Sequence, residues 1–326
     1  MTDSIELSHL DVASVLRILH RHTQPTPERP LFLWTLFEGV PKFYRDAFEQ
    51  GVLGADRRAL LDRLFFRSSL PLRSEADTWY LAELRGRLDT ILKLIARNPG
   101  LRRGDIVKRI READEGGAEQ VSTYLAQLAD RYRLVERRQP VFAKPTGKQG
   151  RYYLNDNFLQ AWLAAIGNRV AAKDFRPVAE LIQEADERLQ DVEGFALEKL
   201  AAQLYQERSS KGIGDFPLSR RVEGFWDRKE VEIDLVLVSK PLKRVRFGSC
   251  KRNPKKLVAD VNNFRGHVER YFAHRPLDRG WTYDLVGVAP RMDVAQRETL
   301  ARHGVVGQDL NDLTRGLLPV SQGELG

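Results

Sequence analysis

The sequence predicts an α+β protein of several domains, and three observations support that class. The chain has 326 residues, 42% of them hydrophobic, which is enough for two or three domains with ordinary cores. Its first half carries apolar residues mainly at helical spacing. Its last third alternates strand-like runs with helical segments, which is typical of an α/β domain with a mixed sheet. We therefore expect a helical region, a unit of three helices and a hairpin, a helical connector and an α/β domain, over residues 1–85, 86–156, 157–191 and 192–326.

Charge and cysteine content narrow the classes of partner and compartment. The net charge of +8 and the pI near 9.6 favour a polyanionic partner such as nucleic acid. Cys250 is the single cysteine, so an intrachain disulfide is excluded and a reducing compartment is favoured. No apolar run approaches the roughly 18 residues needed to cross a bilayer, and the first residues lack the pattern of a signal peptide. We expect a cytoplasmic protein without a membrane partner.

Residues 1–85 are expected to be helical with one interruption. The segment TQPTPERP, residues 23–30, contains three prolines and is predicted to be extended or turning. Apolar residues at helical spacing flank this segment, in residues 10–22, 31–48 and 57–66.

Residues 86–156 have the element order of a winged helix-turn-helix. Three amphipathic segments predict three helices, and two β-type runs around a Pro-Thr-Gly-Lys-Gln-Gly turn predict a hairpin, the wing. Residues 85–151 hold 16 Lys and Arg against 8 Asp and Glu, an excess equal to that of the whole chain. Such side chains are suited to phosphate contacts, and the candidates on the wing and near the second helix are Lys144, Lys148, Arg151, Arg102, Arg103 and Lys108. The alternative is a winged helix that contacts protein, with these charges simply solvated.

A second cluster of candidates lies on two strands predicted in the α/β domain. If the turn between them centres on Pro241 and Leu242, Asp234 lies opposite Ser249. Ser249 and Lys251 then share one face, and Cys250 points the other way. A carboxylate between apolar neighbours is costly unless it is paired or binds a metal. One interpretation is a structural Asp234–Lys251 ion pair at the edge of the sheet.

The other interpretation is a divalent-metal nuclease site. Glu198 lies on the helix before these strands, so an acid on a helix, an acid on a strand and a lysine on the next strand would meet. Mg²⁺ prefers hard oxygen ligands, and a bound Mg²⁺ lowers the pKa of a water and positions a scissile phosphate. A lysine beside it can orient that water or stabilise developing charge.

Four segments resemble a known family, in the same order along the chain. They resemble the C-terminal region of the archaeal-type ATPases, also called DEXX-box or MNS-type ATPases, and they are EGVPKFY (38–44), RYYLNDNFLQAWLAAI (151–166), FWDRKEVEIDLVLV (225–238) and FGSCKR (247–252). The resemblance implies a helical lid, a winged helix and a PD-(D/E)XK nuclease-like domain. It also implies that Asp234 is the first acid of the nuclease-like site, Glu198 the helix acid and Lys251 the lysine.

The chain departs from that family in two ways. No G-x-x-x-x-G-K-[ST] sequence is present, so we expect no nucleotide to bind and no ATPase activity from this chain alone. The family motif Glu-x-Lys reads Ser249-Cys250-Lys251 here, and a neutral hydroxyl is a poor ligand for Mg²⁺. Glu232, on the same strand face as Asp234, or Asp260, at the start of the next helix, are the candidates to replace the missing acid.

Three functions follow as hypotheses. The first is a DNA-associated protein whose nuclease-like site is weakened or inactive, with Mg²⁺ bound weakly at Asp234 and Glu198. The second is an active Mg²⁺-dependent endonuclease, a DNA phosphodiesterase with a relocated acid. The third is a non-enzymatic adaptor of a separate P-loop ATPase subunit.

Overall fold

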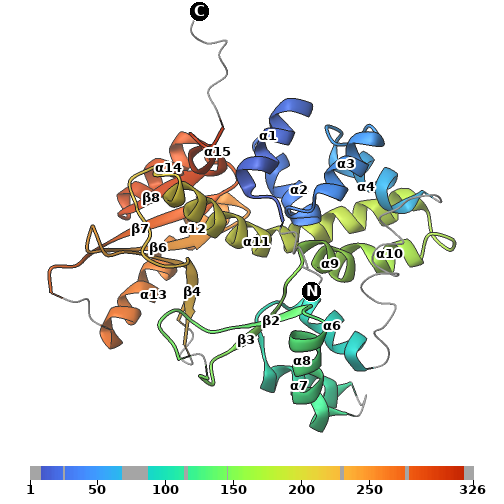
Figure 1. The fold of residues 1–326 in the computed structure, drawn as a ribbon, viewed down its shortest axis with the longest axis horizontal. Coiled ribbons are helices and arrows are strands. Elements are labelled where there is room, and N and C mark those ends of the chain that lie inside the picture. The colour runs from blue at the N-terminus through green and yellow to red at the C-terminus, as the bar shows by residue number, and fades with distance from the viewer. Residues whose placement is uncertain are drawn as a thin grey trace, which may run out of the picture.

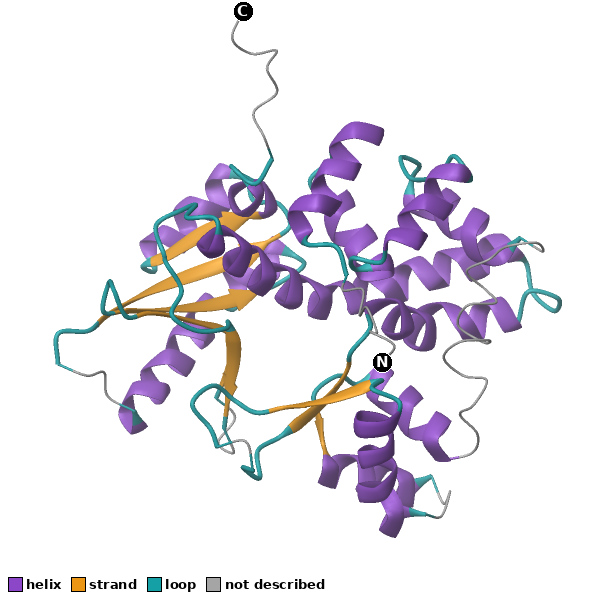
Figure 2. Cartoon of the chain, viewed as in Figure 1, coloured by secondary structure: helices purple, strands orange, loops and turns teal. Residues whose placement is uncertain are grey.

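The computed structural model describes residues 9–24, 26–67, 87–113, 117–144, 146–227, 231–275 and 279–318. It is a mixed α and β structure with two sheets, one small and one of five strands (Figure 1, Figure 2). The expected boundary between residues 85 and 86 lies outside the described residues. Within the described residues, every helix is too short or too polar to span a membrane.

The N-terminal region is helical, as its apolar spacing predicts. Its elements are α1 (Val12–His22), α2 (Arg29–Phe37), α3 (Pro41–Glu49) and α4 (Arg57–Leu61), which continues into a π-helical turn (Asp62–Phe66). Gly39 lies in the tight turn between α2 and α3, where a Cβ atom would come within 2.2 Å of the Leu10 carbonyl oxygen. Glycine is therefore required at this position by the close approach of two backbone segments.

The second unit contains the expected three helices and two hairpin strands. They are α6 (Arg87–Arg97), α7 (Arg103–Glu112), α8 (Val121–Ala126) with a π-helical turn after it (Gln127–Arg131), β2 (Val135–Arg138) and β3 (Arg151–Leu154). A two-residue strand that the sequence did not indicate, β1 (Leu101–Arg102), adds to β3, so the antiparallel sheet has the order β1-β3-β2. The two hairpin strands are only four residues long, and the described residues between them form turns.

One long helix joins the expected connector to the α/β domain. After α9 (Asn157–Ala161), a π-helical turn (Trp162–Ile166) and α10 (Gly167–Ala171), helix α11 runs unbroken over Val178–Ser210. The expected boundary between residues 191 and 192 lies inside this helix. Gly194, in the middle, costs about 1 kcal/mol relative to alanine, but the continuous buried stripe on α11 outweighs it. The stripe includes Leu181, Ala185, Leu189, Leu197, Leu200 and Leu204.

The C-terminal unit is a mixed five-stranded sheet with helices on it. The strands, in spatial order, are β4 (Glu223–Trp226), β5 (Glu232–Ser239), β6 (Arg244–Cys250), β7 (Thr282–Ala289) and β8 (Val305–Asp309). The first three are antiparallel neighbours and the last three are parallel neighbours. The helices are α12 (Pro254–Ala259), α13 (Val261–His274), α14 (Val294–Arg302) and α15 (Leu310–Thr314). The sequence did not indicate β4 or β8. Asp260, expected at the start of the helix after β6, lies instead between α12 and α13.

The two faces of this sheet belong to different cores. Leu235, Leu237 and Cys250 pack in the core that contains the apolar stripe of α11. Val236 and Phe247 point to the opposite face and pack with residues of α12 and α13. This alternation is the period of two expected for strands, and it fixes which side chains of β5 and β6 can reach a common site.

Candidate functional site

The register of β5 and β6 places the candidate residues together. The ladder runs from Ser239 opposite Arg244 to Leu235 opposite Gly248, and just beyond its end Asp234 and Ser249 are in side-chain contact, as the sequence led us to expect. The Asp234 Oδ2 atom accepts hydrogen bonds from the Cys250 N–H over 2.7 Å and from the Ser249 hydroxyl over 3.3 Å. Cys250 is buried with the α11 core.

These side chains surround one cleft between α11 and α13. The cleft has a volume of about 540 Å³. All four predicted residues, Glu198, Asp234, Ser249 and Lys251, line it. The two candidate replacement acids, Glu232 and Asp260, line it as well. Phe195 and His267 also line it, and the sequence analysis did not assign them to the site. His267 accepts the backbone N–H of Glu232 at its Nδ1 atom over 3.1 Å, a long-range contact that no local motif signals.

Burial perturbs both predicted acids. It raises the pKa of Asp234, although the Lys251 charge and the Cys250 N–H act in the opposite direction. It raises the pKa of Glu198 well above its ordinary value, and the negative charges of Asp234 and Glu232 add to that effect. Shifts of this kind accumulate at functional sites because desolvated like charges are placed close together there.

Lys251 is held by a different acid from the one expected. Its Nζ atom lies 3.8 Å from Asp260 Oδ2, and this is its ion pair, so the direct Asp234–Lys251 pair considered from the sequence is not formed. Burial lowers the pKa of Lys251, but the nearby Asp234, Asp260 and Glu198 carboxylates outweigh burial and the net shift is upward. The lysine is therefore a protonated cation at the base of an acidic cleft.

The donor set does not fit a complete magnesium site. Ser249 contributes a neutral hydroxyl that donates to Asp234, and one oxygen of Asp234 already accepts two hydrogen bonds. Among the described residues, His, Cys, Asp and Glu side chains form no group of three or more arranged to hold a metal ion. Mg²⁺ favours charged carboxylate oxygens, so a neutral hydroxyl in place of the second strand acid weakens the ligand set that Asp234 and Glu198 would supply.

A second cleft of about 490 Å³ lies on the other side of the same acids. Glu198, Glu232 and Asp234 form a wall shared by both clefts, and the opposite wall comes from β2 and β3. Lys199 also lines it and donates to the side-chain oxygen of Asn157 over 3.0 Å, while burial lowers the pKa of its ammonium group. No local sequence pattern indicates this cleft, because it depends on how the loop between β2 and β3 packs against the five-stranded sheet.

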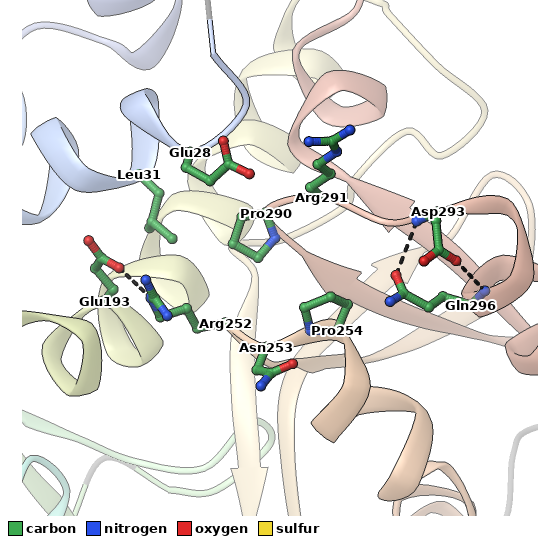
Figure 3. Close-up of a pocket in the computed structure, with 10 residues that line it drawn as sticks. All are labelled: Glu28, Leu31, Glu193, Arg252, Asn253, Pro254, Pro290, Arg291, Asp293 and Gln296. Atoms are coloured by element: carbon green, nitrogen blue, oxygen red, sulfur yellow. Dashed lines mark hydrogen bonds and ion pairs between the residues drawn. The ribbon is translucent and has the colours of Figure 1, made fainter. Parts of the chain in front are cut away.

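A buried ion-pair network lies beside the site. Glu193 on α11 is 2% exposed and bonds both Arg57 of α4 and Arg252, which follows Lys251. Arg252 also lines a separate pocket of about 420 Å³ between the N-terminal helices and the carboxyl ends of β6 and β7 (Figure 3). The network therefore ties the helical region to the segment that carries the lysine.

The six predicted phosphate-binding residues fall into two groups. Lys144 and Lys148 are exposed in the hairpin loop. On α7, Arg103 donates to the Ser122 hydroxyl over 2.9 Å and Lys108 lies 3.7 Å from Glu112, and both cations are exposed. Arg102 and Arg151 instead turn toward the five-stranded sheet. Arg102 donates to the Asp227 carbonyl over 2.9 Å, and Arg151 pairs with Glu232 over 2.6 Å.

Comparison with known proteins gives one family match. Residues 162–260, which contain α11 and β4 to β6, match a family described as archaeal and bacterial proteins of unknown function (DUF234). No curated protein matches the chain. Among solved structures, that of the restriction endonuclease FokI is similar at 10% sequence identity and a TM-score of 0.25, over 70% of this chain and 42% of that chain.

Proposed function

We propose that this chain is a DNA-associated protein in which a winged helix is joined to a PD-(D/E)XK nuclease-like domain with a weakened metal site. The observation that carries the proposal is the convergence of Asp234, Ser249 and Lys251 with Glu198 around one cleft. The residues arrive from two antiparallel strands and a helix, the arrangement that the family resemblance implies. The matched segment, residues 162–260, contains all four.

The DNA partner is proposed from the second unit. Its order of three helices and a hairpin is that of a winged helix, and it carries the excess of positive charge of the whole chain. Lys144 and Lys148 on the loop and Arg103 and Lys108 on α7 are the exposed cations offered to phosphates. Such contacts supply affinity without sequence specificity.

The weakened state follows from the donor set. Hydrolysis of a phosphodiester in such a site needs a metal ion to activate water and to neutralise charge on the phosphate. A serine in the position of the second acid removes one charge from the ligand set and leaves a hydroxyl that donates to Asp234. Low affinity for Mg²⁺, and slow or absent cleavage, are the expected result.

Specific observations also favour two alternative functions. An active endonuclease with a relocated acid is favoured by Asp260 and Glu232, which line the same cleft as Asp234. An adaptor for a separate P-loop ATPase subunit is favoured by the helical region over α1 to α4, whose EGVPKFY segment resembles the family's lid. Mg²⁺-dependent DNA cleavage would support the endonuclease, and capture of an ATPase without DNA binding would support the adaptor.

The decisive experiment replaces the missing acid. Ser249→Glu places two carboxylates on facing strands, so without metal the variant melts at a lower temperature than wild type. Added Mg²⁺ should raise its melting temperature more than that of wild type, because a cation that binds only the folded state stabilises it. Ser210→Glu, which adds the same charge at the exposed end of α11, is the matched control and should show no response to Mg²⁺.

A plasmid-nicking assay completes the test. Ser249→Glu should gain nicking that depends on Mg²⁺ and disappears in the Ser249→Glu, Asp234→Ala double variant. If the wild-type protein already nicks DNA in a Mg²⁺-dependent and Asp234-dependent way, the endonuclease alternative replaces the weakened site. If Ser249→Glu shows neither a Mg²⁺ response nor nicking, the cleft is not a former metal site.

A further inference from the structure

The hairpin of the second unit packs on the edge strand of the large sheet (Figure 1). The Val141 N–H donates to the Gly224 carbonyl over 2.8 Å, and the Val141 side chain is buried in the core that contains Val236 and Phe247. Near the other end of the loop, the Trp226 Nε1–H donates to the Gln149 carbonyl over 2.8 Å. Both ends of the loop between β2 and β3 are thus fixed to β4.

One ion pair closes this contact. Arg151 is the first residue of β3 and Glu232 is the first residue of β5. The Arg151 guanidinium donates to both oxygens of the Glu232 carboxylate, over 2.6 and 3.4 Å. The guanidinium carbon lies 4.9 Å from the centre of the Trp226 ring, and the Arg151 side chain is only 15% exposed. The cation that the sequence offers to a DNA phosphate is therefore covered by the protein itself.

We infer that the Arg151–Glu232 pair is an autoinhibitory latch, and that Arg151 holds either the Glu232 carboxylate or a nucleic-acid phosphate. The inference rests on the proposed DNA binding by the second unit and adds how that binding is controlled. Carboxylate and phosphate groups accept the same two parallel N–H bonds from a guanidinium, so they compete for it. Arg151 cannot serve both, and the hairpin must leave β4 before Arg151 contacts a duplex.

The surroundings of Glu232 favour the closed arrangement. Glu232 lies on the wall shared by the two clefts, beside Asp234 and Glu198, and its negative charge raises the pKa of both acids. In the closed arrangement the Arg151 guanidinium offsets that charge. Opening the latch leaves three carboxylates close together, so phosphate binding at Arg151 must outweigh this repulsion.

The test removes the competitor and measures binding of a short fluorescent DNA duplex by anisotropy. Glu232→Gln should bind about threefold to fivefold more tightly than wild type, the worth of one half-exposed ion pair. Its affinity should also fall more steeply with salt, by about 0.9 in the log–log slope, because one more phosphate contact forms. Glu223→Gln is the matched control: it removes the same charge from β4, where Glu223 pairs with Arg220 over 2.7 Å, and should gain no more than the general effect of lost negative charge.

Hydrogen exchange gives a readout that does not depend on affinity. The Val141 amide should exchange slowly in free wild-type protein and faster in Glu232→Gln, and DNA should accelerate it in wild type. If wild type binds DNA through Lys144 and Lys148 but Glu232→Gln behaves as Glu223→Gln does, the latch is wrong and the proposed function stands. If neither wild type nor Glu232→Gln binds DNA, both the latch and the proposed DNA binding are wrong.

Discussion

In the cleft between α11 and α13, carboxylates lie half-buried at positions fixed by strand register, whereas the exposed cations on and near α7 lie in solvent. Burial raises the pKa of Asp234 and of Glu198, so each ionised group there destabilises the other. Lys108 and Arg103 sit on an open surface, where salt screens their interactions. The charges of the cleft therefore lower the stability of the fold, whereas the exposed cations on α7 hardly affect it. Removing a charge should be visible by denaturation in the first region and by DNA binding in the second.

The largest expected effect is on the buried ion pairs next to the cleft. Glu193→Gln removes the buried carboxylate that Arg57 and Arg252 share. Arg57 keeps its 2.6 Å ion pair with Asp186, but Arg252 loses its partner, and breaking a buried pair costs about 3 kcal/mol of unfolding free energy. Urea denaturation at pH 7 measures it. Glu180→Gln, an exposed residue of the same helix 3.6 Å from Arg176, should change stability by less than about 0.5 kcal/mol. Equal effects of the two variants would erase the distinction between buried and solvated charge in this chain.

A smaller effect is expected at Glu198, and it depends on pH. The pKa of Glu198 is raised in the folded protein, so the folded protein binds the carboxyl proton more tightly than the unfolded chain does. In the unfolded chain this group has the pKa of an ordinary glutamate, about 4.3. That stability is complete below the unfolded pKa and is lost as pH rises through the folded pKa. Glu198→Gln should therefore be about 1 kcal/mol more stable than wild type at pH 8 and lose that advantage in acid.

Chemical denaturation at several pH values checks this prediction. Glu187→Gln, on an exposed position of α11, is the control and should show no pH-dependent gain. A Glu198→Gln variant that is less stable than wild type at pH 8 would mean that the ionised Glu198 carboxylate does not destabilise the fold. The cleft would then not differ in this way from the exposed cations of α7.

The smallest effect on stability is expected in the hairpin loop. Replacing Lys144 and Lys148 by alanine should leave the unfolding free energy within about 0.5 kcal/mol of wild type. The same pair should lower the salt slope of duplex binding by up to roughly 2, about 0.9 for each lost phosphate contact. Anisotropy titrations at several salt concentrations measure it. An unchanged slope would place the DNA contact elsewhere in the second unit.

Local patterns predicted the β5–β6 hairpin that carries Asp234 and Ser249, but not the segments that pack on it. The turn at Pro241 and Leu242 and the alternation of side chains were sufficient to bring Asp234 beside Ser249, and the two side chains are in contact. The short edge strands β4 and β8 were missed because four or five residues carry too little periodicity. The docking of Arg151 on Glu232 joins residues 81 positions apart, and no local pattern encodes a contact of that kind.

The domain boundaries show the same limit. The boundary expected between residues 191 and 192 lies inside α11, which continues because its buried stripe is continuous on both sides of that position. Lys251 shows the same limit for one side chain, since its partner Asp260 lies between α12 and α13 and not at the start of the first helix after β6.

Helix α11 has a mechanical consequence. A rod of 33 residues rises about 1.5 Å per residue and is therefore about 50 Å long. Asp186 and Glu193 in its first half bond Arg57 of α4, and Glu198 lines the cleft. Near its end, Glu207 accepts the Val12 and Ala13 N–H groups of α1. Because no linker interrupts the helix between these contacts, we expect a displacement of α4 to move Glu198 with it.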